Sequence, residues 1–261
     1  MVSRIVSLLA IGGLLVAAAS ANVYTTSFEN PPFVVGSIIG QDGWVAGSGS
    51  GNSQSIVNTF ARTGTQSLFW DNSSTLNSFY SVRHPFDGQS GAISPATPLE
   101  ISAWLFVTQG TGADRLYGVY ATNSGTGTLG STALGITISG SGDLRAGTTW
   151  SATYSAPPLY SNPALVGSWV KVLLSYDGVG GGAAVYDSGL NLLYSTSFAT
   201  VNLTNANGAT PASWNVNLGT DYNTTTARLG QGYHDDFSVV VVPEPASLLV
   251  LSLGLLALRR R

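Results

Sequence analysis

The sequence predicts an all-β domain built as a two-sheet antiparallel sandwich. Strand-like apolar runs recur roughly every 10–20 residues, with turn residues between them. Away from the two chain ends, no segment keeps the 3.6-residue apolar period that an amphipathic helix needs. No repeat of 20–50 residues is visible, so the pattern does not indicate a propeller or a solenoid. A sandwich of two antiparallel sheets is the architecture that remains.

The first part of this domain is predicted to alternate short strands with long loops. A strand over 23–28 opens it, and a loop rich in glycine and serine follows over 36–52. A second long loop begins at Pro85 and contains several further prolines and glycines. The other strands predicted in this part cover residues 55–60, 67–70 and 79–83.

The remaining strands show clearer patterns. Apolar side chains alternate through 99–108, where Leu99, Ile101, Ala103, Leu105 and Val107 share one face. The same alternation through 169–176 begins two tandem hairpins that continue over 183–187 and 190–195. Four consecutive valines mark a closing strand over 237–242 that is apolar on both faces. Shorter strands are predicted over 115–120, 133–139 and 143–148.

Composition favours an extracellular β-protein. Charged residues make up 9% of the 261 residues, whereas Gly, Ser, Thr and Asn are abundant. Cysteine is absent, so the chain forms neither a disulfide nor a thiolate metal site. The domain holds six basic and twelve acidic residues, a net charge of about −6. This charge and the lack of a basic stripe argue against binding to nucleic acid.

Residues 1–21 are predicted to be a secretory signal peptide. Arg4 supplies the positive start, an apolar run covers 5–19, and Ala19-Ser20-Ala21 matches the small-x-small cleavage rule. We expect cleavage before Asn22. An uncleaved membrane anchor is the alternative, and the small residues that end the run disfavour it.

The C-terminal tail has the pattern of a transient membrane anchor. Pro243 and Pro245 flank Glu244, so neither a helix nor a strand continues through this point. The apolar run 246–258 has 13 residues, and as a helix it covers about 20 Å of a hydrocarbon core about 30 Å thick. Three terminal arginines favour the cytoplasmic side. The order is typical of a sorting signal whose tail is removed. A small unprocessed membrane helix is the alternative.

These parts in this order resemble the PEP-CTERM sorting domain. The resemblance implies recognition by an exosortase-type membrane protease-transferase while the helix lies transiently in the inner membrane. It also implies delivery to the cell envelope, the cell surface or the extracellular space. The chain then divides into a signal peptide (1–21), a β-sandwich (22–242) and the sorting signal (243–261). The residues that carry the resemblance are Pro243, Glu244, Pro245, Arg259, Arg260 and Arg261.

The domain itself resembles the jelly rolls of concanavalin A-like proteins and carbohydrate-binding modules. The resemblance implies a jelly-roll sandwich whose first and last strands are close in space. It further implies a structural calcium ion held by Glu29 and Asp236, with Asp235 as a third ligand. Ordinary surface carboxylates at strand ends are the alternative. The stretches that carry the resemblance are 27–29, 43–44, 62–68, 168–172, 176–178 and 234–239.

Aromatic residues are the candidate carbohydrate contacts, because a flat ring can stack on the apolar face of a sugar. Trp150, Tyr154 and Tyr160 lie outside the clear strand patterns and form the predicted stacking platform. Trp104 and Trp169 lie within strands, and we expect them in the core. Packing inside a cysteine-free sandwich is the alternative for all of these rings.

No catalytic set stands out. A glycosidase needs two carboxyl groups about 5–10 Å apart, and Glu29 and Glu100 are the domain's only glutamates. No Gly-x-Ser-x-Gly nucleophile elbow occurs. The sequence therefore favours an exported, non-enzymatic cell-surface or biofilm-matrix protein that contacts exopolysaccharide. The alternatives are a carbohydrate-binding module with a defined glycan, and a polysaccharide hydrolase or lyase on the same jelly roll.

Overall fold

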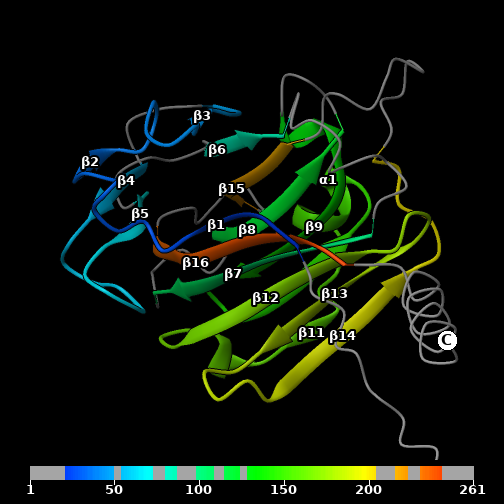
Figure 1. Ribbon diagram of the computed structural model, residues 1–261. Helices are drawn as coiled ribbons and strands as arrows, with labels where there is room; N and C mark the ends of the chain where they lie inside the picture. Colours follow the sequence, from blue (N-terminus) through cyan, green and yellow to red (C-terminus); the bar gives the residue numbers. More distant parts are fainter. Residues whose placement is uncertain are drawn as a thin grey trace, which may run out of the picture.

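The computed structural model describes residues 21–49, 54–72, 80–86, 98–108, 115–123, 128–203, 215–222 and 230–242. These residues form two antiparallel sheets packed face to face (Figure 1). The predicted sorting signal over 243–261, and the predicted signal peptide except Ala21, lie outside the described residues. Among the described residues, no helix has the length and apolar character that a membrane crossing requires.

The larger sheet has nine strands in the order β14-β13-β12-β7-β16-β5-β4-β2, with β1 also paired to β16. β5 pairs with residues 231–234 of β16, and β1 pairs with residues 237–241. The first and last strands are therefore neighbours, as predicted. The strands are β1 (Ala21–Thr26), β2 (Gly36–Ser37), β4 (Gln54–Val57), β5 (Ser67–Asp71), β7 (Leu99–Val107), β12 (Trp169–Tyr176), β13 (Gly181–Tyr186), β14 (Leu192–Phe198) and β16 (Gln231–Val241).

The smaller sheet has seven strands in the order β11-β10-β9-β8-β15-β6-β3. Its central strands β8 and β15 pair over eight residues each. Two short 3₁₀ turns, η1 (Leu129–Ser131) and η2 (Pro163–Leu165), join strands. The strands are β3 (Val45–Ala46), β6 (Tyr80–Pro85), β8 (Arg115–Thr122), β9 (Thr132–Ser139), β10 (Asp143–Gly147), β11 (Tyr160–Ser161) and β15 (Asn215–Tyr222).

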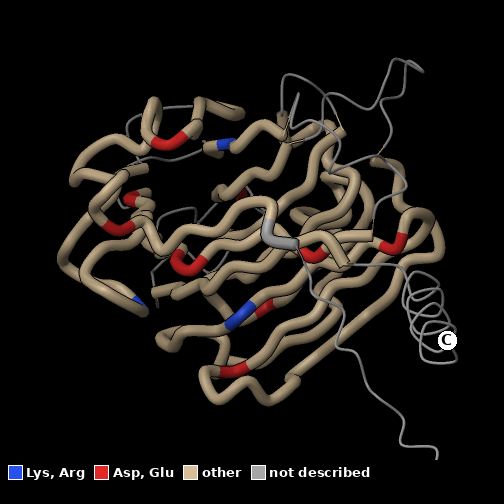
Figure 2. Tube along the Cα trace, viewed as in Figure 1, with Lys and Arg blue, Asp and Glu red and all other residues tan. Residues whose placement is uncertain are grey.

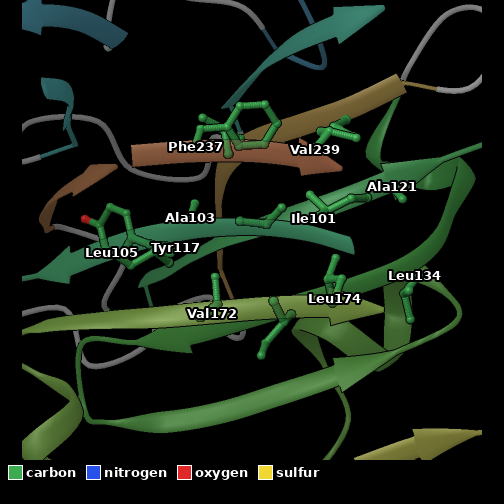
Figure 3. Close-up of a cluster of buried hydrophobic side chains, with 14 of the residues drawn as sticks. Ile101, Ala103, Leu105, Tyr117, Ala121, Leu134, Val172, Leu174, Phe237 and Val239 are labelled. Atoms are coloured by element: carbon green, nitrogen blue, oxygen red, sulfur yellow. The ribbon is translucent and has the colours of Figure 1, made fainter. Parts of the chain in front are cut away.

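The core fills the space between the sheets, where alternate side chains of each strand meet (Figure 3). Ile101 and Leu105 of β7 and Val172 of β12 come from the larger sheet, and Tyr117 of β8 comes from the smaller one. All four are buried. The neighbours of these residues in sequence point away from the core, which fixes what each outer face presents.

Among the described residues, one short α-helix, α1 (Trp150–Tyr154), covers part of the smaller sheet. The hydroxyl of Thr149 caps it by accepting a hydrogen bond from the backbone N–H of Ala152 at 3.3 Å. Gly147 permits the contact, because a Cβ at this position would collide with Ala152. The helix thus lies close against the sheet where glycines leave room.

The structure confirms the strongest strand predictions and corrects others. The strands predicted over 99–108 and 169–176 are β7 and β12. The predicted loop over 36–52 contains the short strands β2 and β3. β15 was not predicted, and β16 begins at Gln231 instead of at residue 237. Both strands place polar side chains in buried positions, so their sequences lack the apolar alternation on which the prediction relied.

Candidate functional site

Four aromatic residues stand in one row across the outer face of the larger sheet. Phe69 of β5 pairs with Tyr233 of β16, Tyr233 with Phe106 of β7, and Phe106 with Trp169 of β12. Their neighbours Leu68, Leu105 and Val170 are core residues, so the four rings point outward. We call Phe69, Tyr233, Phe106 and Trp169 the aromatic ladder.

Each ring of the ladder is in contact with the next ring along the row, and all four rings are only half-buried. Their centroids lie 4.8 Å apart for Phe69 and Tyr233, 6.2 Å for Tyr233 and Phe106, and 5.6 Å for Phe106 and Trp169. Phe60 adds a fifth ring, 4.7 Å from Phe106, 4.9 Å from Tyr233 and 5.5 Å from Trp169, to which it is nearly parallel. The outer face therefore carries a continuous aromatic surface.

Sequence reasoning placed Trp169 and Trp104 in the core, and the structure confirms burial for Trp104 but not for Trp169. Trp169 belongs to the half-buried ladder. Trp104 is buried, but it lies on the outer face in the next row, between Asp235 and Lys171. The guanidinium carbon of Arg62 stands 3.5 Å above its ring centroid and covers it. The strand alternation places both tryptophans on the face opposite the core, and on that face only Trp104 is buried.

Three carboxylates fasten the connection between β4 and β5 to the sheet. Glu29 accepts hydrogen bonds from the backbone N–H groups of Gln66 at 2.7 Å and Thr65 at 2.8 Å. Asp235 accepts one from the backbone N–H of Arg62 at 2.8 Å. Asp235 and Asp236 lie at the point where β16 changes its neighbour from β5 to β1. We call Glu29, Asp235 and Asp236 the carboxylate clamp.

Asp236 completes the clamp through side chains. Its two carboxylate oxygens accept hydrogen bonds from the guanidinium of Arg62 at 2.6 Å and from the hydroxyl of Thr63 at 2.5 Å. Its backbone has a positive φ of 45°, at the irregularity in the pairing of β16 with β7. The irregularity turns the carboxylate toward the Arg62 loop.

Burial and hydrogen bonding move the pKa values of the clamp in opposite directions. Burial raises the pKa of Asp235 to about 7, although three backbone N–H groups favour its ionised form. Burial also acts to raise the pKa of Glu29, but the N–H groups of Gln66 and Thr65 outweigh it and the net pKa is lowered. Glu29 is therefore the more firmly ionised of the two carboxyl groups.

The clamp does not fit the calcium site that the resemblance implied. Glu29, Asp235 and Asp236 do gather near one place, and Glu29 and Asp236 line a pocket of about 420 Å³. Their oxygens, however, accept hydrogen bonds from N–H, O–H and guanidinium donors, which a cation would have to displace. Among the described residues, no three acidic, histidine or cysteine side chains form a group suited to a metal ion.

The predicted stacking platform is divided. Trp150 and Tyr154 stand together on α1, with ring centroids 4.7 Å apart, and the Trp150 indole N–H donates to Asp221 at 2.5 Å. Tyr160 of β11 instead stacks on Tyr194 of β14, with centroids 5.4 Å apart and ring planes 15° apart. Tyr160 thus joins the margins of the two sheets instead of extending a platform on α1.

The outer face of the smaller sheet carries a polar row that the sequence did not reveal, buried at Asn217 and Tyr120 and half-buried at Arg83. Arg83 of β6 pairs with Asn217 of β15, and Asn217 pairs with Tyr120 of β8. The hydroxyl of Tyr120 and the side-chain oxygen of Asn217 are buried without a hydrogen-bond partner. Burial and the charge of Asp221 raise the pKa of Tyr120 well above its ordinary value. Residues so distant in sequence give no local signal.

Comparisons with known proteins concern the fold. No family model and no curated protein matches the sequence. The endo-β-1,4-glucuronan lyase of the fungus Trichoderma reesei is 13% identical over 85% of this chain and 96% of its own, with a TM-score of 0.54. A botulinum neurotoxin serotype D/C binding domain is 10% identical over 84% of this chain and 48% of its own, with a TM-score of 0.52.

Arcelin-5, a lectin-like defence protein from Phaseolus vulgaris, is 11% identical over 85% of this chain and 98% of its own, with a TM-score of 0.49. At such low identities the likeness shows the fold alone. The domain is an all-β, two-sheet antiparallel jelly-roll sandwich, which confirms the predicted fold class.

Proposed function

We propose that the chain is an exported, non-enzymatic protein of the cell surface or extracellular matrix that contacts polysaccharide through the aromatic ladder. The observation that carries the proposal is the register of Phe69, Tyr233, Phe106 and Trp169 across four neighbouring strands. Packing within the sandwich does not require this row, because the core lies on the other side of the sheet.

A sugar ring suits such a surface. The C–H groups of a pyranose form an apolar face that can lie on an aromatic ring, while its hydroxyl groups stay in water. A row of half-exposed rings on a rigid sheet offers several such contacts at little cost in conformational entropy. Within the part of the chain that the structure describes, charges are few and scattered and form no basic stripe (Figure 2). This distribution favours an uncharged contact surface over one for nucleic acid.

A polysaccharide lyase is the second candidate, and the polar row of the smaller sheet is the observation that favours it. Arg83 and Asn217 could neutralise a uronate carboxylate, and Tyr120 could transfer a proton. The raised pKa of Tyr120 opposes this role, because a tyrosine that serves as a base needs a lowered pKa. Tyr120 is also fully buried. These properties support the binding proposal over the lyase.

The binding proposal is tested by comparing two tryptophan variants of the full chain. Trp169→Ala removes one ring of the ladder, and Trp150→Ala removes a half-buried ring on α1 as the matched control. Binding is measured by co-sedimentation with cellulose, xylan, alginate, glucuronan and the exopolysaccharide of the producing cells. We expect Trp169→Ala to weaken retention about tenfold on the polysaccharide that binds, since one ring contact is lost.

The control is expected to keep its affinity. If Trp150→Ala loses retention and Trp169→Ala does not, the contact surface is on α1 and the ladder is excluded. If no polysaccharide retains the natural chain, the binding proposal fails. Melting curves of both variants show that a loss of retention is not a loss of folding.

A further inference from the structure

The edge strand β14 at one end of the larger sheet is open to pairing with another strand. The strand orders of the two sheets end at β14, β2, β11 and β3, and β1 is a further edge strand, because among the described residues it pairs with β16 alone. β2, β11 and β3 are two residues long, which leaves almost no free backbone for another strand to pair with. β14 is seven residues long, and among the described residues no strand pairs with its far side.

The sequence of β14 also lacks the residues that discourage strand pairing. Natural edge strands usually carry a lysine, a proline or an inward-pointing charge. β14 (Leu192–Phe198) contains none of them, and no charged residue occurs anywhere from Ser188 to Thr220. Ser195 and Ser197 are exposed on it. Its free N–H and C=O groups are therefore available to a partner strand.

Two exposed leucines extend this edge into an apolar contact surface. Leu190 and Leu192 are 58% and 56% exposed. Leu190 has a positive φ of 64° in the turn between β13 and β14, a backbone conformation that is usually adopted by glycine or asparagine. The turn is held by Asp187, whose Oδ1 accepts the backbone N–H groups of Gly189 and Asn191. A strained leucine on a rigid, solvent-facing turn points to a contact with another molecule.

We propose that β14 pairs antiparallel with β14 of a second copy of this chain, joining the two larger sheets into one. The uncharged strand favours this occupant, because a strand that meets its own copy places like residues opposite one another. A strand of charged residues would repel itself, whereas serine, threonine and apolar side chains do not. Antiparallel pairing of identical strands is two-fold symmetric, and two-fold symmetry is the commonest symmetry of homo-oligomers.

The geometry predicts which residue lies on the two-fold axis. Ser195 is the middle residue of Leu192–Phe198, so in a centred register Ser195 faces its own copy and Leu192 faces Phe198. Opposed residues of antiparallel strands have Cα atoms about 4.5–5.5 Å apart, within the range that a disulfide bridges. The absence of cysteine from the natural chain makes a single introduced cysteine an unambiguous reporter.

The first test is the mass of the full chain in solution, measured by sedimentation over a range of concentrations. We expect a monomer–dimer equilibrium, and we expect Ser195→Lys together with Ser197→Lys to halve the mass by placing like charges at the contact. Ser155→Lys is the matched control, an exposed serine at the end of α1 on the other sheet. It should leave the dimer intact.

The second test scans single cysteines from Leu192 to Phe198 under mild oxidation. Cross-linked dimers should peak at Ser195→Cys or at an adjacent position, and Ser155→Cys should give none above background. A chain that is monomeric at every concentration overturns the proposal. A dimer that survives both lysines, or cysteines that cross-link without a maximum along β14, also overturns it. These measurements do not involve polysaccharide, so their outcome is independent of the proposal that the aromatic ladder binds polysaccharide.

Discussion

At the scale of the residue, His234 joins the two sheets through the middle of the core. Its Nδ1 accepts a hydrogen bond from the indole N–H of Trp70 at 2.9 Å. Its Nε2 lies 3.1 Å from the carbonyl oxygen of Gly118 in the other sheet. Since the indole can only donate, the proton of the neutral ring sits on Nε2 and is donated to Gly118. Burial lowers the pKa of His234 from 6.5 to about 4.

The lowered pKa predicts a loss of stability in acid. Above pH 6.5 the imidazole is neutral in both folded and unfolded chains, and its full contribution is present. As the pH falls from 6.5 to about 4, the unfolded chain takes up a proton that the folded chain resists. The loss is on the order of 3 kcal/mol in the free energy of unfolding.

The raised pKa of Asp235 has the opposite effect, because the folded chain takes up this proton first as the pH falls below about 7. The His234 effect is therefore read as a difference between the natural chain and His234→Gln, a neutral residue that can keep both hydrogen bonds. We expect the natural chain to be the more stable above pH 6.5 in urea titrations. The difference in free energy of unfolding between the two chains should shrink toward pH 4. A difference that does not depend on pH would contradict the lowered pKa of His234.

The carboxylate clamp predicts that calcium is not needed for folding. The oxygens of Glu29, Asp235 and Asp236 already accept hydrogen bonds, so we expect the same melting temperature with calcium and with a chelator. Arg62→Ala should instead lower the free energy of unfolding by about 1–2 kcal/mol, since it removes the ion pair to Asp236 and uncovers Trp104.

Lys171→Ala is the matched control for Arg62, because it removes a cation from the same face, in the row of Trp104. It should change the free energy of unfolding by less than Arg62→Ala does. A melting temperature that falls in the chelator and returns with calcium would restore the calcium site implied by the resemblance.

At the scale of the element, the sequence predicts a strand well where apolar residues recur at every second position along one face. β7 and β12 alternate cleanly, and their predicted and observed bounds nearly agree. β15 was not predicted, because the polar residues Asn215, Asn217 and Asp221 occupy its other face and are nevertheless buried. A buried polar face has the sequence of an exposed loop, so only the pairing with β6 and β8 identifies the strand.

The same limit explains why the aromatic ladder was not predicted from the sequence. Phe69, Phe106, Trp169 and Tyr233 are spread over about three quarters of the domain, and only strand order and register bring them into one row. Sequence reasoning favoured aromatic residues in loops, and so selected Trp150, Tyr154 and Tyr160. The acids of the clamp were found because a jelly roll implies that first and last strands meet, but the donors that occupy their oxygens were not foreseeable.

The ladder and β14 belong to the same sheet, which gives the two proposals a common geometry. β12, which carries Trp169, is separated from β14 by β13 alone. An antiparallel pair of β14 strands has its two-fold axis perpendicular to the sheet, so both copies present their ladders on the same side. Two ladders on one joined sheet would bind one polymer at two points, and the second contact forms at a high effective concentration.

At the scale of the whole molecule, the domain holds together without disulfides. Its cohesion comes from the core between the sheets, from His234 across them, and from hydrogen bonds that fasten loops to sheet faces. β1 begins at Ala21, directly before the predicted cleavage site, and pairs with β16 up to Val241. The first and last described strands thus lie side by side. The predicted signal peptide and the predicted sorting signal would therefore join the sandwich in the same region.

The C-terminal tail, residues 243–261, has the pattern of a transient anchor. A 13-residue apolar run is too short for a stable membrane span. We therefore expect it to hold the exported chain only until an exosortase-type enzyme acts at Pro243-Glu244-Pro245. Deleting residues 243–261 should leave export intact but divert the chain from the cell surface or matrix to the soluble periplasmic fraction. Fractionation of the producing cells, followed by immunoblotting, measures this.

A second variant separates sorting from simple anchoring. Replacing Pro243, Glu244 and Pro245 with alanine keeps the apolar run and the three arginines, so the chain can still enter the membrane but loses the extended break. We expect this variant to accumulate in the inner membrane at its full C-terminal length, as mass spectrometry of the terminal peptide would show. If it reaches the surface with the natural terminus, the tail is an anchor and not a sorting signal. Identical fractionation of all three chains would remove any role for the tail in localisation.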